Sequence, residues 1–133
     1  MKKIGLFWGL FSMLLGLGAC QSSDDKTMET DYRQITMTEA EELFQLDGTY
    51  LIVDVRTVQE YEEGHIPGAI CIPNESISDE VPELPDKNQL IYIYCRSGNR
   101  SKQAAKKLVD LGYTNIVEFG GIIDWDGEIE TGK

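Results

Sequence analysis

The chain has 133 residues, 41% of them apolar, and it carries 23 acidic side chains against 12 basic ones. This length supports one domain, and the apolar content is ordinary for a globular protein. The formal charge of −11 repels nucleic acid phosphates and no basic cluster offsets it, so we expect no nucleic acid partner.

The N-terminal segment is the most apolar part of the chain. Lys2 and Lys3 are followed by sixteen uncharged residues, 4–19, a pattern typical of the charged and apolar regions of a secretory signal. The run ends in Leu-Gly-Ala-Cys at residues 17–20, which resembles the lipobox of bacterial lipoproteins. In that family the signal is cut before the cysteine, and the cysteine carries the lipid.

This resemblance implies a signal peptide over residues 1–19 and a lipid on Cys20. Cleavage would remove two lysines and no acids, which takes the formal charge from −11 to −13. The alternative is an uncleaved membrane anchor, although a spanning helix needs about 20 apolar residues and this run is shorter. Both alternatives predict an extracytoplasmic domain that is held at a bacterial membrane.

Residues 20–31 are polar and charged, and we interpret them as a flexible tether. They lead to a folded domain that we expect over residues 32–133. Near its start, Thr38 and Glu41 fit a capping box, in which a hydroxyl and a carboxylate satisfy free amides at a helix start. This pattern predicts a helix over residues 39–46.

Four short runs rich in apolar and β-branched residues predict strands in the rest of the domain: residues 51–55, 69–72, 90–94 and 116–119. Thr57 and Glu60 fit a second capping box for a short helical turn that ends at Gly64. Residues 101–111 carry an apolar stripe of helical period, and Gly112 suits a left-handed helix end. Alternating strands and helices predict an α/β fold with a mainly parallel central sheet flanked by helices.

Cys95 ends the third predicted strand and precedes a turn into the long helix. A loop that enters a helix start points backbone amides inward and the helix dipole adds positive potential, so a thiolate is stabilised there. Arg96 and Arg100 add positive charge and suit an anionic substrate. Gly98 permits a tight turn with positive φ, and Asn99 tolerates the same angles. The alternative is a buried, unreactive cysteine beside two solvated arginines.

Two motifs in this chain resemble the signatures of the rhodanese family. The first comprises Asp-Val-Arg at 54–56, Glu-Tyr at 60–61 and Gly-His-Ile-Pro-Gly-Ala-Ile at 64–70. The second is the loop from Cys95 to Ser101, which a helix follows. The late pair Gly120-Gly121 and Trp125 are similar to the closing glycines and tryptophan of the family.

The resemblance covers residues 33–126 and implies a rhodanese-like three-layer α/β sandwich that uses no cofactor. It implies a sulfurtransferase in which Cys95 attacks a sulfane sulfur donor, holds the sulfur as a persulfide and passes it to an acceptor. The expected donor is a small thiosulfate-like anion, the expected acceptor is a thiol or cyanide, and we expect a monomer. The substrate-binding loop would consist of Arg96, Ser97, Gly98, Asn99 and Arg100.

Five further residues of the motifs are candidates for a supporting role: Asp54, Arg56, Glu60, His65 and Ser101. We favour an internal ion-pair network that braces the loop for the three charged residues, over direct substrate contact. The histidine belongs to a turn motif in the family, so we favour structural hydrogen bonding over a Cys–His pair. No CxxC pair is present and there is one histidine, so we expect no metal site.

Cys71 departs from the family pattern, which commonly has asparagine at this place. It is either a small, inert core residue, which we favour, or a resolving thiol for oxidised or persulfidated Cys95. A structural disulfide between the two cysteines is also open.

Two other functions compete with sulfur transfer. The same fold serves phosphatases and arsenate reductases, whose loop is one residue longer between cysteine and arginine. Here Cys95 and Arg100 enclose four residues, which suits sulfur rather than a larger oxyanion. The other alternative is a non-catalytic sulfur-carrier or binding module at the membrane.

Overall fold

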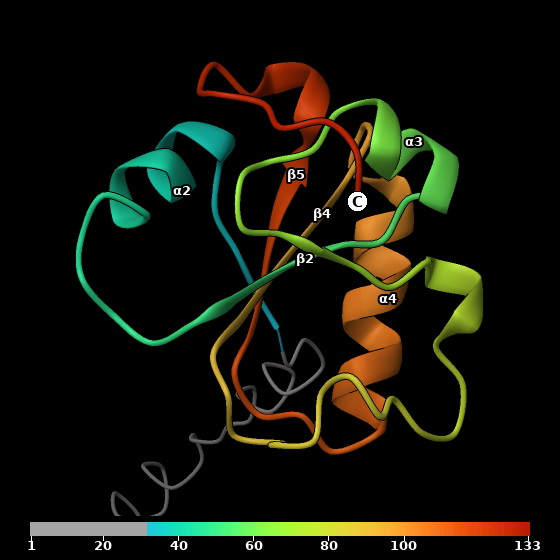
Figure 1. Cartoon of the computed structure of the whole chain (residues 1–133). Coiled ribbons are helices and arrows are strands. Elements are labelled where there is room, and N and C mark those ends of the chain that lie inside the picture. The colour runs from blue at the N-terminus through green and yellow to red at the C-terminus, as the bar shows by residue number, and fades with distance from the viewer. Residues whose placement is uncertain (1–31) are drawn as a thin grey trace, which may run out of the picture. The chain divides into compact units, whose positions relative to one another are not determined.

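Figure 1 shows the computed structural model of the chain, which describes residues 32–133. The predicted signal peptide over 1–19, the predicted lipid on Cys20 and the predicted tether over 20–31 therefore lie outside the described residues. Within residues 32–133, no helix combines the length and the apolar character needed to cross a membrane.

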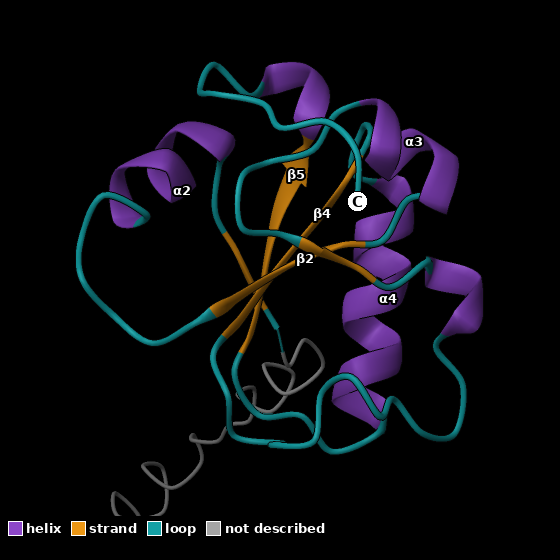
Figure 2. Cartoon of the chain, viewed as in Figure 1, coloured by secondary structure: helices purple, strands orange, loops and turns teal. Residues whose placement is uncertain are grey.

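Five strands form one sheet in which every neighbouring pair is parallel (Figure 2). The order β1-β5-β4-β2-β3 places β4 at the centre of the sheet. All four predicted strands are present, and β1, which has two residues, was not predicted. The strands are β1 (Arg33–Gln34), β2 (Leu51–Asp54), β3 (Ile70–Cys71), β4 (Ile91–Cys95) and β5 (Ile116–Gly121).

Helices cover both faces of the sheet, which confirms the predicted α/β sandwich. The helix α4 (Asn99–Asp110) packs on one face against β4 and β5, and α2 (Met37–Leu43) packs on the other face against β5 (Figure 1). Ile91 and Ile93 join the core under α4, while Tyr92 and Tyr94 join the core under α2. Both faces of β4 are therefore buried, which explains its nearly continuous apolar sequence.

The first helix starts two residues earlier than predicted. Thr36, not Thr38, is its N-cap, because the Thr36 hydroxyl accepts from the Glu39 amide and the Glu39 carboxylate accepts from the Thr36 amide. This register buries Met37 and Ala40 against the sheet. The helix also ends at Leu43, three residues before the predicted end, because residues 44–46 form a turn.

The second predicted capping box is confirmed at the start of α3 (Val58–Glu63), where Thr57 and Glu60 cap each other and Gly64 is the C-cap. The short 3₁₀ helices η2 (Asn74–Ser76) and η3 (Ile122–Asp124) were not predicted.

The helix after the cysteine loop also begins two residues earlier than predicted, at Asn99 rather than Ser101. Gly98 is its N-cap with φ of +107°, so the predicted positive φ at this glycine is confirmed. Asn99 is the first helical residue and does not share that angle. At the other end, Gly112 has φ of +102°, as predicted.

Candidate active site

Cys95 is the last residue of the central strand β4, at the carboxyl edge of the parallel sheet. Open α/β sheets bind their ligands at this edge. Residues 96–98 form the turn from Cys95 into α4, so the cysteine lies directly before the helix start. The residue is 1% exposed, and its side chain belongs to the core on the α4 side.

Two polar groups contact the sulfur of Cys95. The Gly98 amide donates to Sγ across 3.0 Å, and the Ser101 hydroxyl oxygen lies 3.4 Å from Sγ. The positive φ of Gly98 turns its amide back toward the strand end. The amide and the N-terminus of α4 both direct positive potential at the sulfur.

Gly121 lets β5 approach the cysteine loop closely. A Cβ atom at this position would overlap the carbonyl oxygen of Arg96, so no other residue fits without a shift of the loop. The Ile123 amide donates to the same carbonyl across 3.3 Å, which fixes the loop from the side of β5. The second glycine of the Gly-Gly motif is therefore required by the close approach of β5 to the loop.

Arg100 is held by Glu60, which stands at the start of α3. Nη1 donates to Oε1 across 2.8 Å and Nη2 donates to Oε2 across 3.2 Å, a bidentate pair. The hydrogen bond from Arg100 holds the pKa of Glu60 at about 2, against an ordinary value of 4.5. The Arg100 guanidinium is therefore directed at Glu60.

Arg96 is the exposed cation of the loop, and the described residues give it no ion-pair partner. It lines a hollow of about 260 Å³ that opens beside the cysteine loop. The remaining loop side chains, Ser97 and Asn99, are also exposed. The hollow is lined by residues of α3, of the turns on either side of it, of the cysteine loop and of the C-terminal segment: Arg56, Glu60, Glu63, Gly64, Arg96, Ile122, Ile123 and Ile129.

A buried network lies behind the loop, at the ends of β2 and β4. Arg56 binds Asp54 through Nε at 2.9 Å and Nη2 at 2.6 Å, and the Tyr94 hydroxyl donates to Asp54 Oδ2 across 2.7 Å. The Arg56 guanidinium also donates to the Gly64 carbonyl, and the Tyr94 hydroxyl accepts from the Ile66 amide. The network thus ties two strands to the turn after α3.

The protein-family model of the rhodanese-like domain matches residues 36–128, which include the cysteine loop and the buried network. This chain belongs to the rhodanese-like family. The resemblance of the two motifs to the rhodanese signatures is thereby confirmed.

Named relatives of this rhodanese chain include sulfurtransferases. Thiosulfate sulfurtransferase PspE of Escherichia coli is 37% identical over 73 residues, which are 54% of this chain and 70% of PspE. The putative sulfur carrier protein YrkF of Bacillus subtilis is 39% identical over 85 residues, 63% of this chain, and this match spans 45% of YrkF.

Solved structures agree with the fold. The crystal structure of a rhodanese-like domain protein from Staphylococcus aureus has a TM-score of 0.68 and 33% identity, and the match covers 76% of this chain and 99% of that chain. Together the matches place this chain in a family of sulfurtransferases.

His65 contacts its own turn and the C-terminal segment of the rhodanese domain. Its Nδ1 lies 2.8 Å from the Tyr61 carbonyl oxygen, and its ring stacks on the Tyr61 ring with 3.7 Å between centroids. Its Nε2 lies 3.6 Å from a carboxylate oxygen of Glu130. Across residues 32–133 no hydrogen bond joins His65 to Cys95, and no group of three His, Cys, Asp or Glu side chains is placed to hold a metal ion. The geometry favours the structural interpretation of this histidine.

Cys71 and Cys95 are both free thiols. Cys71 pairs in register with Asp54, and Asp54 pairs on its other side with Tyr94. Because neighbouring strands lie about 4.8 Å apart, Cys71 is two strand spacings from β4, too far for a disulfide with Cys95. Burial, followed by the charge of Asp54, raises the pKa of the Cys71 thiol to about 11. Both observations favour an inert Cys71.

The sequence did not single out two buried side chains near the site, Tyr94 and Glu118. Tyr94 was predicted to be an ordinary strand residue, but it is a member of the buried network. Glu118 is 2% exposed and accepts from the Ser101 hydroxyl across 2.5 Å. The signal for Glu118 was present, because an acid stands in the middle of the otherwise apolar run Ile-Val-Glu-Phe at residues 116–119.

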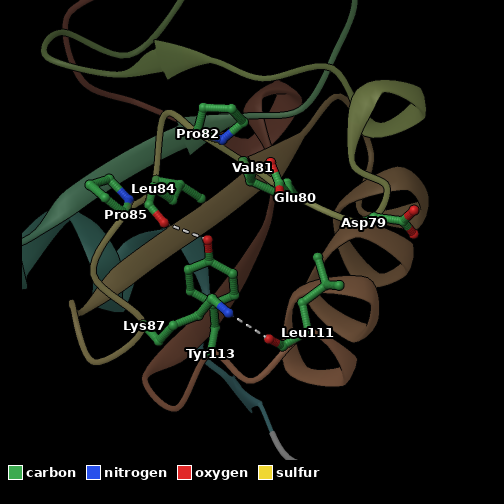
Figure 3. A pocket seen from close by; sticks show the side chains of 9 residues that line it. All are labelled: Asp79, Glu80, Val81, Pro82, Leu84, Pro85, Lys87, Leu111 and Tyr113. Carbon is green, nitrogen blue, oxygen red and sulfur yellow. Dashed lines mark hydrogen bonds between the residues drawn. The ribbon is translucent and has the colours of Figure 1, made fainter.

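Another hollow, of about 230 Å³, lies beside the C-terminal end of α4, whereas the cysteine loop lies at the N-terminal end (Figure 3). Lys87 Nζ donates to the Leu111 carbonyl and the Tyr113 hydroxyl donates to the Leu84 carbonyl, as the dashed lines show. None of the predicted site residues lines this hollow. These bonds fasten the loop before β4 to the helix end, so we assign the hollow to packing.

Proposed function

We propose that this rhodanese domain moves a sulfane sulfur from a small anionic donor such as thiosulfate to a thiol or cyanide, through a persulfide on Cys95. The observation that carries the proposal is the place of the Cys95 sulfur, which receives the Gly98 amide at the start of α4. Membership in a family with named sulfurtransferases supports the reaction class.

The proposed reaction has two displacement steps on sulfur. The Cys95 thiolate attacks the outer sulfur of thiosulfate, the S–S bond of the donor breaks, and sulfite leaves with the electron pair. The acceptor then attacks the terminal sulfur of the persulfide, and the Cys95 thiolate leaves. No general base is needed at the moment of attack when the thiolate is already formed.

The charged side chains at the loop contribute to donor binding in different ways. Arg96 is exposed beside the loop and has no carboxylate partner among the described residues, so it attracts the anionic donor. Arg100 adds positive charge from a fixed position, because Glu60 holds its guanidinium. Asp54 and Arg56 brace the turn behind the loop through the buried network.

Mass spectrometry after exposure to thiosulfate tests the proposal. We expect a gain of one sulfur atom on the peptide that contains Cys95, its loss on addition of cyanide, and no gain in Cys95→Ser. An unmodified thiol would contradict sulfur transfer and favour a binding module.

A phosphatase-type reaction is tested by assaying a phosphate ester beside thiosulfate. The four residues between Cys95 and Arg100 lead us to expect turnover of thiosulfate alone. Turnover of the ester alone would contradict the proposed function.

A sulfur carrier is the second candidate, because the relative YrkF carries the name putative sulfur carrier protein. A carrier would take up one sulfur per chain and release it only to a specific partner. A transferase would produce thiocyanate from thiosulfate and cyanide over many cycles. Measuring thiocyanate formed per mole of protein separates the two.

We also propose that the domain acts outside the cytoplasm of a bacterium, held at a membrane by a lipid on Cys20. The charged and apolar N-terminal pattern and the lipobox-like residues 17–20 support this proposal. We expect the chain in the membrane fraction and Cys20→Ser outside it, with Cys71→Ser as the control that keeps membrane attachment. A Cys20→Ser chain that stayed fully membrane-bound would contradict lipidation.

A further inference from the structure

Glu118 is a buried carboxylate without a cationic partner. It is 2% exposed, and no lysine, arginine or histidine of residues 32–133 forms an ion pair with it. Its Oε2 accepts from the Gly120 amide across 3.0 Å and from the Ser101 hydroxyl across 2.5 Å, and its Oε1 accepts from the Gln34 amide group across 3.4 Å. Burial of a carboxylate that only neutral donors bind costs free energy, so we expect a functional reason for Glu118.

Ser101 connects this carboxylate to the sulfur of Cys95. The residue is fully buried in the first turn of α4, and its Oγ lies 3.4 Å from Cys95 Sγ on one side and 2.5 Å from Glu118 Oε2 on the other. The Gly98 carbonyl lies 3.0 Å from the same Oγ. A hydroxyl has one proton to donate, so it cannot serve all three neighbours at once.

The distances decide where that proton lies in the resting protein. The contact with Glu118 is the shortest and its acceptor carries charge, so the hydroxyl donates to Oε2. Ser101 then presents a lone pair to sulfur, which suits a thiol that donates and not a thiolate. A thiolate needs the hydroxyl proton turned toward Sγ, and the short Oγ–Oε2 contact then needs a proton on Glu118.

We infer that Cys95 and Glu118 share one proton through Ser101, and that the thiol ionises by passing its proton to Ser101 while Ser101 passes its own to Glu118. The S–H bond breaks as an O–H bond forms on Ser101, and the former O–H bond breaks as one forms on Oε2. The number of protons and the charge of the trio stay constant, and no oxidant is involved. Glu118 acts through Ser101, so it is a positioning residue for the sulfur chemistry.

This arrangement limits the site to one buried negative charge. Two anions separated by one hydroxyl repel each other strongly in a buried site, so such a pair titrates as a unit. With the proton on Glu118, an incoming anionic donor meets a thiolate and no second anion behind it. The inference rests on the proposed function in one respect, that Cys95 is the reactive thiol.

Other charged groups face the trio from the surrounding elements. On the sulfur side they are Arg96 of the loop, Arg100 of α4, Glu60 of α3, Asp54 of β2, and Arg56, which lies two residues beyond the end of β2. On the carboxylate side, Glu39 of α2, Lys102 of α4 and Asp124 of η3 line a hollow with Glu118. Burial raises the pKa of nearby Tyr32 and the charge of Glu118 raises it further.

The first test follows the ultraviolet absorbance of the Cys95 thiolate against pH, as the difference between the protein and its Cys95→Ser variant. When one of the two protons has left the pair of Cys95 and Glu118, the single negative charge is divided between Sγ and Oε2, so only part of the protein carries a thiolate. The rest of the thiolate forms when the second proton leaves, so we expect the thiolate signal to rise in two steps. Glu118→Gln should reduce it to one step. The matched control Glu39→Gln, which lines the same hollow outside the hydrogen-bond chain, should keep two steps. One step in the unaltered protein, or two in Glu118→Gln, would overturn the inference.

The second test needs no variant at Glu118. Alkylation of Cys95 with iodoacetamide removes its titratable group, so no thiolate charge then holds a proton on Glu118. At a pH between the two steps, we therefore expect Glu118 to lose its proton on alkylation. We expect the infrared band of a protonated carboxylic acid to disappear on alkylation, and an unchanged band would contradict the shared proton. Neither test uses a sulfur donor, so a failure of sulfur transfer and a failure of this inference are separate outcomes.

Discussion

Glu60 and Arg100 are forty residues apart in the sequence, yet they form a bidentate ion pair beside the cysteine loop. The two side chains meet because α3 follows β2 and α4 follows β4, and the carboxyl ends of these neighbouring parallel strands lie at the same edge of the sheet. One partner caps α3 and the other lies in the first turn of α4, so the pair fastens the two helix starts together.

Replacement of Glu60 by glutamine tests how much this ion pair contributes to the stability of the fold. Glutamine can still complete the capping box with Thr57, so the change removes mainly the charge that faces Arg100. The pair is partly exposed, so we expect the free energy of unfolding to fall by about 1 kcal/mol or less. Urea unfolding measures the loss. Glu63→Gln on the same helix is the control, and an equal loss there would contradict a specific role for Glu60.

The contribution of Glu60 depends on pH in a defined direction. Its pKa is about 2 in the folded chain and near 4.5 without its partners, so the folded state favours the ionised form. The stabilisation is fully present above pH 4.5 and disappears as the pH falls through about 2. We therefore expect the difference in unfolding free energy between the protein and Glu60→Gln to be constant near neutral pH and to vanish toward pH 2. A difference that grew in acid would contradict this assignment.

Removal of the Tyr94 hydroxyl should destabilise the domain through two lost hydrogen bonds. Tyr94→Phe leaves Asp54 without one of its buried donors and leaves the Ile66 amide without an acceptor. An unsatisfied buried group costs about 1–3 kcal/mol, so we expect a loss in that range by thermal or urea unfolding. Tyr92→Phe is the matched control on the same face of β4, because no hydrogen bond of its hydroxyl is found within residues 32–133. Equal losses would contradict the network.

The sequence predicted those features of the fold that depend on local pattern. The runs that form β2 and β4 are apolar on both faces, so their strands could be recognised without knowledge of their neighbours. The start of α2 was placed wrongly because Thr36 and Thr38 both precede a glutamate by three residues. Only the burial of Met37 and Ala40 against the sheet selects between them.

Tertiary partners in the site could not be predicted in the same way. Arg100 was expected to face substrate. Glu60 was expected to belong to an ion-pair network that braces the loop, but the local sequence did not identify Arg100 as its partner. The contact between Ser101 and Glu118 joins α4 to β5 across 17 residues, and it depends on the way both elements pack. The acid Glu118 inside an apolar strand does predict a buried polar contact, but it does not identify the partner of that contact.

Cys71→Ser should leave sulfur transfer unchanged. The pKa of the Cys71 thiol is about 11, so about one molecule in ten thousand carries a Cys71 thiolate at pH 7. Its position two strand spacings from β4 also separates it from the persulfide. We expect equal rates of persulfide formation and turnover in the protein and the variant, measured by mass spectrometry. A slower release of sulfur from Cys71→Ser would establish a resolving role.

Gly121→Ala should disturb the cysteine loop from the side of β5. The new Cβ would overlap the Arg96 carbonyl, so the loop has to shift or the strand has to separate from it. Overpacking of this kind costs about 1–3 kcal/mol. Because Gly98 and its hydrogen bond to Cys95 lie in the same turn, we also expect slower persulfide formation. Gly48→Ala is the control, since its Cβ would make only ordinary contact with Tyr50. Persulfide formation at the unaltered rate in Gly121→Ala would show that the close approach of β5 does not position the loop.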